Sequence, residues 1–154
     1  MAVNPDFLGR DFTLPEPYEV AVEDLRAFAD AVGAQNPACR SRAAARALGH
    51  PGVVAAPTFA VKIAQRAESL YVSDPAAGID FARVVHAEER FAHHRPIVDG
   101  DRLDATVWVE AINSRGALTT VTTRTEITAA APEADPPEPV ATVWSTLAIR
   151  GEQA

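Results

Sequence analysis

Residues 57–72 read PTFAVKIAQRAESLYV and form the longest helical pattern in the chain. Apolar side chains recur on one stripe of this pattern; they are Phe59, Ile63, Ala67, Leu70 and Tyr71. Three further residues widen the stripe, namely Ala60, Val61 and Ala64. We predict a helix that begins at Pro57 or Thr58, ends near Val72 and is buried on most sides. A helix of this kind needs another layer of structure around it.

Two shorter helical patterns precede this segment and follow an extended opening at residues 12–20. In the first, apolar residues recur at helical spacing at Val22, Leu25, Phe28, Ala29 and Val32. Glu23 and Asp24 occupy its first turn, where the helix dipole favours negative charge, and Gly33 ends it. In the second, Ser41 is the predicted N-cap of a helix over residues 42–48.

Four strand patterns follow the long helix and supply the layer that it needs. They cover residues 83–92, 102–112, 117–127 and 140–149. The first alternates imperfectly, with Val85, Ala87 and Phe91 predicted on one face. We predict a turn at 113–116 and a solvated, mobile excursion at the Pro- and acid-rich residues 129–139. The order of elements indicates an α+β fold with an antiparallel sheet.

Composition excludes several classes of protein. The 154 residues fit a single domain, 1–154, and the formal net charge of −7 disfavours a nucleic-acid partner. One cysteine, Cys39, allows no intrachain disulfide and is typical of a reducing compartment. The first residues do not resemble a signal peptide, and no segment has the length of apolar sequence that a membrane span requires. We therefore expect a soluble cytoplasmic protein.

The segment FADAVGAQNPACRSRAAARALGHPGVVAAPTF, residues 28–59, resembles the signature region of the MaoC-like, R-specific enoyl hydratase family. The matches are Ala29, Ala31, Val32, Gly33, Asn36, Pro37, Ala43, Ala44, Gly49, Gly52, Ala55, Pro57, Thr58 and Phe59. RPIVDGD, residues 95–101, is similar to the strand–turn–strand junction of the family. The resemblance implies a hot-dog fold, in which an antiparallel sheet wraps a long central helix. Within the family, the chain is most similar to small (3R)-hydroxyacyl-thioester dehydratase subunits that lack catalytic residues.

Two departures from the family pattern bear directly on function. Catalytic members carry Asp at the position of Ala34 and His at the position of Cys39, and this pair orients water and moves the α-proton of the acyl thioester. General acid–base catalysis needs groups that exchange protons near neutral pH, which a methyl group cannot do and a thiol, with a pKa near ~8.5, does poorly. The resemblance thus implies no catalytic residue at these positions.

The resemblance also implies a substrate-binding function for the start of the long helix. In the family, backbone amides at the start of this helix bind the thioester carbonyl; here that position is the stretch Pro57, Thr58 and Phe59, and Asn36 lies in the same signature. Helix N-termini carry unpaired N–H groups and a positive dipole end, which suit a developing oxyanion. We expect no cofactor and no metal.

Three other groups carry side chains capable of chemistry. Cys39 as a nucleophile requires a neighbour that lowers its pKa, for which only Arg40 is adjacent, although the fold could bring His50 close. His86 and Glu88 lie two apart on a predicted strand and hence on one face, as a displaced acid–base pair or as a solvated surface. His93 and His94 point to opposite faces of a strand and do not suit a single metal ion.

The leading hypothesis is a non-catalytic subunit of a heteromeric (R)-3-hydroxyacyl dehydratase in fatty-acid or related acyl metabolism. Its partner would be a catalytic hot-dog chain that supplies Asp and His, and its substrates would be acyl-ACP or acyl-CoA. One alternative is a homodimer that binds acyl thioesters without turnover. Another is an active hydratase that uses His86 and Glu88.

Overall fold

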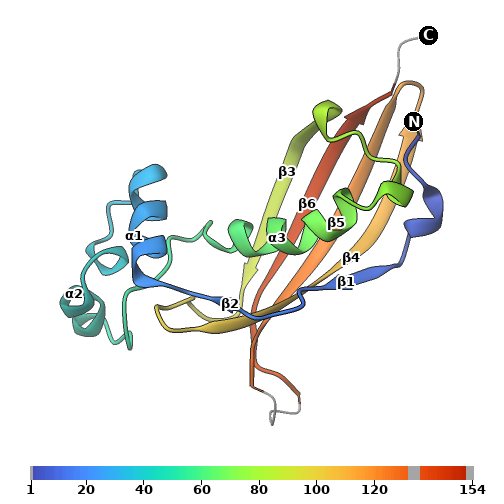
Figure 1. The fold of residues 1–154 in the computed structure, drawn as a ribbon. Helices are drawn as coiled ribbons and strands as arrows, with labels where there is room; N and C mark the ends of the chain where they lie inside the picture. The colour runs from blue at the N-terminus through green and yellow to red at the C-terminus, as the bar shows by residue number, and fades with distance from the viewer. Residues whose placement is uncertain (1, 132–135, 152–154) are drawn as a thin grey trace.

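An antiparallel sheet of six strands, with one helix lying across one of its faces, makes up most of the molecule (Figure 1). The computed structural model describes residues 2–131 and 136–151. The covering helix is α3 (Ala60–Val72). Figure 1 shows α1 (Val22–Ala31) and α2 (Arg42–Ala47) set apart from the sheet, beyond the start of α3. The predicted α+β hot-dog arrangement is confirmed.

The strands pair in the order β1-β4-β5-β6-β3, and β2 also pairs with β4. Their bounds are β1 Asp11–Thr13, β2 Tyr18–Glu19, β3 Val84–His93, β4 Arg102–Arg115, β5 Leu118–Ala129 and β6 Pro139–Arg150. In β4, β5 and β6, buried residues alternate with more exposed ones, because successive side chains point to opposite faces. β3 is an edge strand, with β6 as its neighbour on one side only.

The apolar stripe predicted for α3 faces the sheet. Phe59, Ile63, Ala67 and Tyr71 are fully buried, whereas Leu70 is partly exposed. The helix begins at Ala60, later than predicted, because residues 57–59 form a tighter turn in which Phe59 N–H donates to Ala56 C=O at 2.9 Å. One charged residue, Glu68, lies within this buried face at 5% exposure.

Side-chain caps begin α2 and the four 3-10 turns, whereas α1 has none. Ser41 caps α2 as predicted, its hydroxyl accepting from Ala44 N–H at 3.2 Å. Each of four 3-10 turns is preceded by an Asn or Asp whose side chain accepts an amide two residues on. These turns are Pro5–Phe7, Pro37–Cys39, Pro75–Ala77 and Phe81–Arg83. Local caps therefore fix the irregular segments around the sheet.

The predicted turn at 113–116 is wrong. β4 continues through Arg115, which pairs with Leu118, so the hairpin turns on Gly116 and Ala117 alone. Gly116 has a φ of 59°, the left-handed conformation that a two-residue hairpin loop requires. At the other end of β5, Ala129 N–H donates to Glu138 C=O, so the excursion predicted at 129–139 is narrower than expected. Its central residues, 132–135, lie outside the described residues.

The face prediction for residues 83–92 is also wrong. The β3–β6 register shifts between His86 and Glu88, which leaves Ala87 as a bulged residue. Val85 pairs with Ala148 and is 65% exposed, whereas Phe91 pairs with the buried Val143 on the helix side. The apolar and polar residues of this strand alternate imperfectly because the bulge shifts the residues on either side of Ala87 by one position.

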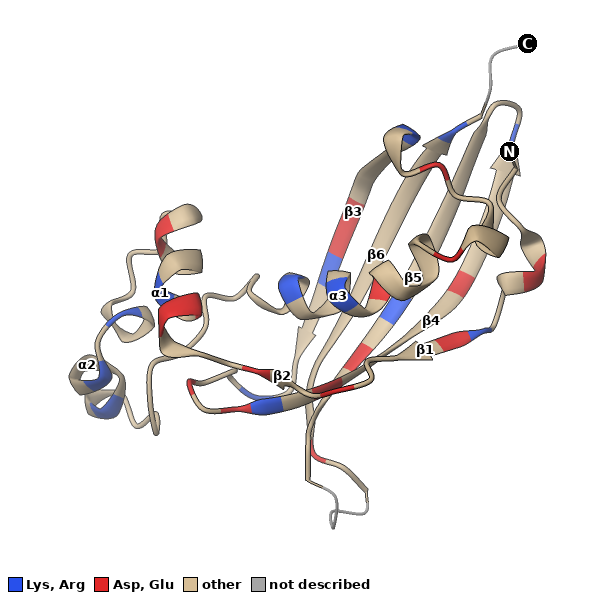
Figure 2. Ribbon diagram, in the orientation of Figure 1, with Lys and Arg blue, Asp and Glu red and all other residues tan. Residues whose placement is uncertain are grey.

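The outer face of the sheet, opposite α3, carries two tryptophans with arginines stacked on them. The Arg124 guanidinium carbon lies 4.7 Å from the Trp108 ring centre, and that of Arg90 lies 3.9 Å from the Trp144 ring centre. Figure 2 shows acidic and basic segments interspersed over the sheet and the helices. Within the described ranges, none of the helices has the length and apolar character needed to cross a membrane.

Candidate functional site

A pocket of about 660 Å³ opens at the start of α3; we call it the helix-start pocket. Three parts of the chain and one isolated histidine form its walls, namely residues 34–36 with Cys39, residues 54–57 with Ala60, residues 93–97, and His50. Ala34, Cys39, Asn36 and Pro57 all line it, so the fold brings together the positions that the sequence had linked only by resemblance. This volume lies in the range usual for small-molecule sites.

Arg40 holds the loop that carries Ala34. Its guanidinium donates to the Ala34 carbonyl oxygen and, through Nε and Nη2, to Asp30 Oδ1 at 3.1 and 2.8 Å. Arg26 Nε in turn donates to the Arg40 carbonyl at 2.9 Å. Asn36 Oδ1 accepts from Ala38 N–H at 3.0 Å and so caps the turn that ends in Cys39. The pocket wall around Ala34 is thus held by α1.

A second wall forms where two loops pair. Val54 and Val98 make an antiparallel bridge, and Val54 N–H donates to Ala38 C=O at 3.0 Å. Gly52 lets the loops approach, because a Cβ there would lie 1.9 Å from Asp99 Oδ1. Three separate segments are therefore tied together beside the start of α3.

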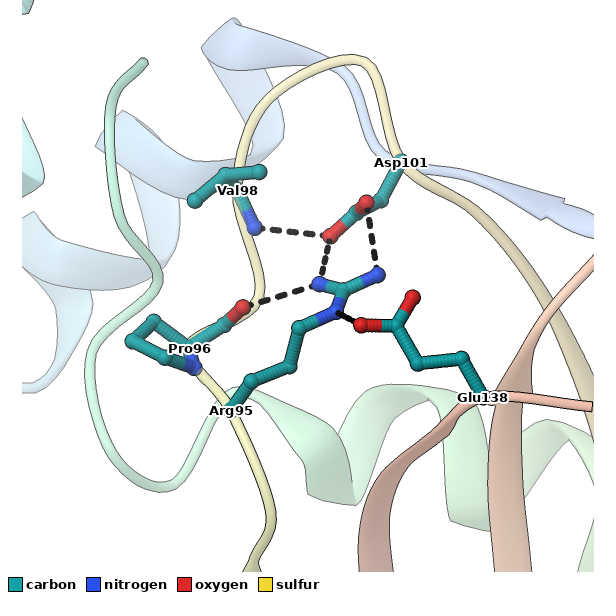
Figure 3. A network of polar contacts seen from close by, with 5 residues as sticks. All are labelled: Arg95, Pro96, Val98, Asp101 and Glu138. Atoms are coloured by element: carbon teal, nitrogen blue, oxygen red, sulfur yellow. Dashed lines mark hydrogen bonds and ion pairs between the residues drawn. The ribbon is translucent and has the colours of Figure 1, made fainter. Parts of the chain in front are cut away.

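Arg95 braces the junction between β3 and β4 (Figure 3). Its two terminal nitrogens donate to Asp101 at 2.8 and 3.1 Å, and its Nε donates to Glu138 at 3.0 Å. Asp101 also accepts from Val98 N–H at 2.9 Å. The hydrogen bonds to Asp101 and the attraction of its negative charge raise the pKa of Arg95 above its ordinary value. The segment resembling the family junction therefore forms a charged brace that positions Pro96 and Ile97 in the pocket wall.

At the start of α3, Pro57 and Ala60 line the pocket, whereas the other two predicted residues do not. Phe59 is 0% exposed, packs edge-on against Phe28, and uses its N–H within the turn. Thr58 is exposed and does not line the pocket. Ala60 lines it as the first residue of α3. The sequence missed Ala60 because it predicted an earlier helix start.

Cys39 is 3% exposed, and burial raises the pKa of its thiol, which the positive charge of Arg40 opposes only in part. His50 lies in the same pocket, but no hydrogen bond joins it to Cys39 in the described part of the chain. His93 stacks on Phe91, whereas His94 Nε2 lies 3.2 Å from the Thr142 hydroxyl, so the two rings diverge. The arrangement favours a neutral thiol over a thiolate nucleophile.

His86 and Glu88 do not lie on one face, contrary to the prediction. The bulge at Ala87 leaves His86 opposite Leu147 on the helix side and turns Glu88 to the outer face, opposite Thr146. His86 instead lies beside Glu89, with Nδ1 3.8 Å from Glu89 Oε2. His86 and Glu88 therefore do not form the acid–base pair on one strand face that the sequence suggested.

Glu68 is the second residue that sequence reasoning missed. Its carboxylate accepts a hydrogen bond from the Thr123 hydroxyl at 2.7 Å inside the helix–sheet layer. The signal was present in the sequence, since position 68 follows Ala64 by four residues and falls within the apolar stripe. A charged residue in such a stripe is rarely buried without a partner.

Comparisons with known proteins agree on the family. The family described as FAS1-like, dehydratase domain region, matches residues 6–134. A UPF0336 protein of Saccharopolyspora erythraea is 43% identical over 151 residues, which is 98% of this chain and 94% of the relative.

Two solved structures share the fold. One is in the C-terminally truncated HadBC (3R-hydroxyacyl-ACP dehydratase) complex from Mycobacterium tuberculosis, at 29% identity and a TM-score of 0.80, covering 93% of this chain and 97% of that one. The other is a MaoC-like dehydratase, at 29% identity and a TM-score of 0.82, where the match covers 94% of this chain but 42% of the longer one. The chain is therefore a hot-dog protein that belongs to the FAS1-like dehydratase-region family.

Proposed function

We propose that this chain is the non-catalytic subunit of a heteromeric (R)-3-hydroxyacyl-thioester dehydratase of fatty-acid or related acyl metabolism in the cytoplasm. One observation carries the proposal: Ala34 and Cys39 line the helix-start pocket where the family's proton carriers stand. A methyl group and a buried thiol with a raised pKa cannot exchange protons at neutral pH. Turnover then requires a partner with the Asp and His.

The helix-start pocket retains what binding requires. Its walls are mainly apolar, its volume suits a small molecule, and Ala60, at the positive end of the α3 dipole, lines it. These features suit the carbonyl oxygen of an acyl thioester, carried on ACP or coenzyme A. Asn36 and Pro57 would form the rim, whereas Thr58 and Phe59 would support the helix start from outside the pocket.

The partner would pair with β3. This ten-residue strand has an unpaired edge in the part of the chain that the structure describes, and such edges are association sites. The related HadBC structure is a complex of dehydratase subunits, which supports a mixed pair. In that pair this chain would extend the sheet and cover one side of the acyl tunnel.

The test is hydration of a crotonyl thioester, measured with the purified chain alone and again with a catalytic hot-dog chain from the same source. We expect no turnover alone and a large increase in the rate of the partner when this chain is added. The matched control is the partner mixed with a Val85→Pro variant of this chain. The proline removes a backbone N–H from β3 at an exposed position and should weaken pairing along this strand. Turnover by the isolated chain at an ordinary enzymatic rate contradicts the proposal.

Native mass spectrometry of the protein from its source cell separates the proposal from a homodimeric acyl-thioester binding protein. A mixed dimer of two different hot-dog chains is the expected species. A lone homodimer that binds acyl-CoA and never exchanges subunits supports the homodimer instead.

A further inference from the structure

Basic and acidic residues are unevenly distributed around the helix-start pocket. Residues 31–67 contain no Asp or Glu, although the whole chain has 21 acidic residues and a formal net charge of −7. The same stretch contains five basic residues, which are Arg40, Arg42, Arg46, Lys62 and Arg66. It also forms α2, the first part of α3 and two walls of the helix-start pocket. The surroundings of this pocket are therefore more basic than the chain as a whole.

Two arginines of α2 bring this charge to the surface. Arg42 and Arg46 are four residues apart on one face of the helix, and both are exposed. Arg42 bonds to Asp99 at 2.9 Å, but its side chain is 54% exposed whereas that of Asp99 is 12% exposed. The carboxylate is thus buried, and the guanidinium is the part of this pair that solvent meets. Arg46 makes no ion pair in the described part of the chain, so its charge is not neutralised by a neighbour.

The same face of α2 is otherwise small and apolar. Ala43 and Ala47 are exposed beside the arginines, and Leu48, which follows the helix, is 62% exposed. Small side chains let a partner approach closely, and an exposed leucine among arginines has the mixture of apolar contact and positive charge that protein interfaces favour. We call this surface, made of Arg42, Ala43, Arg46, Ala47 and Leu48, the α2 face. Figure 2 shows basic segments and no acidic ones on α2, whereas the neighbouring α1 carries acidic segments.

The α2 face lies beside the helix-start pocket. Cys39 precedes α2, His50 follows it, and both line the pocket. The cation within the pocket wall, Arg95, is already engaged by Asp101 and Glu138. Accessible positive charge is therefore spread along a helix outside the pocket. A nucleotide phosphate needs donors that converge on one point, whereas charges spaced along a helix suit the surface of an acidic protein.

We propose that the α2 face is the docking surface for an acidic acyl carrier protein, which delivers its thioester into the helix-start pocket. This inference rests on the proposed function, from which it takes the acyl thioester as ligand. The charge pattern favours a protein carrier over coenzyme A, whose negative charge is concentrated in its nucleotide phosphates. Exposed charges at the edge of an interface act mainly on the rate of association, and salt screens them.

The test compares two saturated thioesters that cannot be hydrated, butyryl-ACP with the carrier protein of the source cell and butyryl-CoA. Surface plasmon resonance measures the binding of each to the full-length chain at low and at high salt. We expect Arg46→Glu to weaken butyryl-ACP binding about tenfold at low salt, chiefly through slower association, and by a smaller factor at high salt. Butyryl-CoA binding should change by less than about twofold, because the nucleotide does not touch the α2 face.

The matched control is Arg115→Glu, an equal charge reversal at an exposed arginine in the β4–β5 hairpin, which lies far from α2 (Figure 1). This variant should bind butyryl-ACP as the wild type does. Leu48→Ser, which keeps every charge, should weaken butyryl-ACP binding at both salt concentrations alike. Urea denaturation of each variant shows that its fold is retained.

Unchanged butyryl-ACP binding by a folded Arg46→Glu variant overturns the inference. An equal loss for both thioesters also overturns it, because the α2 face would then recognise nucleotide phosphates. The proposed function fails separately from the docking surface. Salt-sensitive butyryl-ACP binding through Arg46, together with crotonyl-thioester turnover by the isolated chain, contradicts the non-catalytic assignment and supports the α2 face.

Discussion

The helix-start pocket lies at the beginning of α3, and a second pocket of about 520 Å³, lined by Glu68, His86 and Leu147 among others, lies along the later turns of the helix. The two pockets differ in their chemistry. The first is held by the charged brace at Arg95 and has a methyl group, from Ala34, and a thiol, from Cys39, in its wall. The second has no counterpart in the family signature, yet it contains a buried carboxyl beside a histidine. The comparison shows that the two ends of one helix border pockets of different polarity, one without and one with a buried carboxyl in its wall.

The largest effect should come from restoring proton carriers to the helix-start pocket. We expect Ala34→Asp combined with Cys39→His to raise crotonyl-CoA hydration by the isolated chain by about 100-fold or more over background, the usual contribution of general acid–base groups. The assay follows loss of the enoyl thioester. With this result, both pockets would contain a carboxyl group and a histidine.

The control for this gain of function is Ala34→Asn combined with Cys39→Gln, which adds similar volume without a proton carrier. A folded Asp/His double variant no more active than the Asn/Gln variant would show that the loop around Ala34 no longer matches the catalytic geometry.

The brace at Arg95 should matter more for stability than a similar pair on the outer face. We expect Asp101→Asn to lower the free energy of unfolding by about 2 kcal/mol, because Asp101 is 14% exposed and its bonds are charge-assisted. Glu110→Gln, which breaks an exposed contact with Arg124, should cost about 1 kcal/mol at most. Urea denaturation measures both. Equal costs would mean that the helix-start pocket does not depend on this brace.

Cys39 should react slowly with alkylating reagents. The residue is 3% exposed and burial raises the pKa of its thiol, so we expect iodoacetamide to modify the folded chain about tenfold more slowly than an unfolded one. Mass spectrometry over time gives both rates. Rapid modification of the native chain would reveal a thiolate, and with it chemistry in the helix-start pocket.

Glu68→Gln should have the smallest effect, and one that depends on pH. In the wild type the folded chain holds the Glu68 proton more tightly than the unfolded chain does, so stability from this group falls as pH rises from the ordinary value of 4.5 through the raised folded pKa. The Gln variant has no such loss. Its stability relative to wild type should therefore increase across that window and stay level above it.

The measurement is urea denaturation at several pH values. Glu88→Gln on the outer face controls for the loss of one negative charge. Glu89 and His86 from β3 face Glu68, and Thr123 and Ser145 are its neutral neighbours from β5 and β6. A constant difference between Glu68→Gln and wild type at all pH values would mean that Glu68 is not held in its protonated form.

Much of the fold could be predicted from local patterns. The stripe of α3, the Ser41 cap and the long alternating strands are properties of short windows, and all appear in the structure. The bulge at Ala87 could not be predicted, because it arises from the register of β3 on β6, some sixty residues away along the chain. That single register shift separated His86 from Glu88.

The candidate site was predictable only in part. The working positions Ala34 and Cys39 came from the resemblance, and the fold places both in one pocket. The helix starts at Ala60 rather than at the predicted Pro57 or Thr58 because residues 57–59 form a tight turn, and a shift of this size is within the usual uncertainty of helix ends. The burial of Glu68 could be predicted only by noticing a charged residue within an apolar stripe. The position of His86 could be predicted only with knowledge of the bulge at Ala87.

The arginine-stacked tryptophans give the molecule a selective optical reporter. The chain has two tryptophans, Trp108 and Trp144, and both lie on the outer face of the sheet, away from α3 and both pockets. Intrinsic indole emission therefore senses solvent and contacts at that face alone. Acyl binding should pass unseen in a fluorescence titration, whereas a subunit that covers the outer face should shift the emission to the blue.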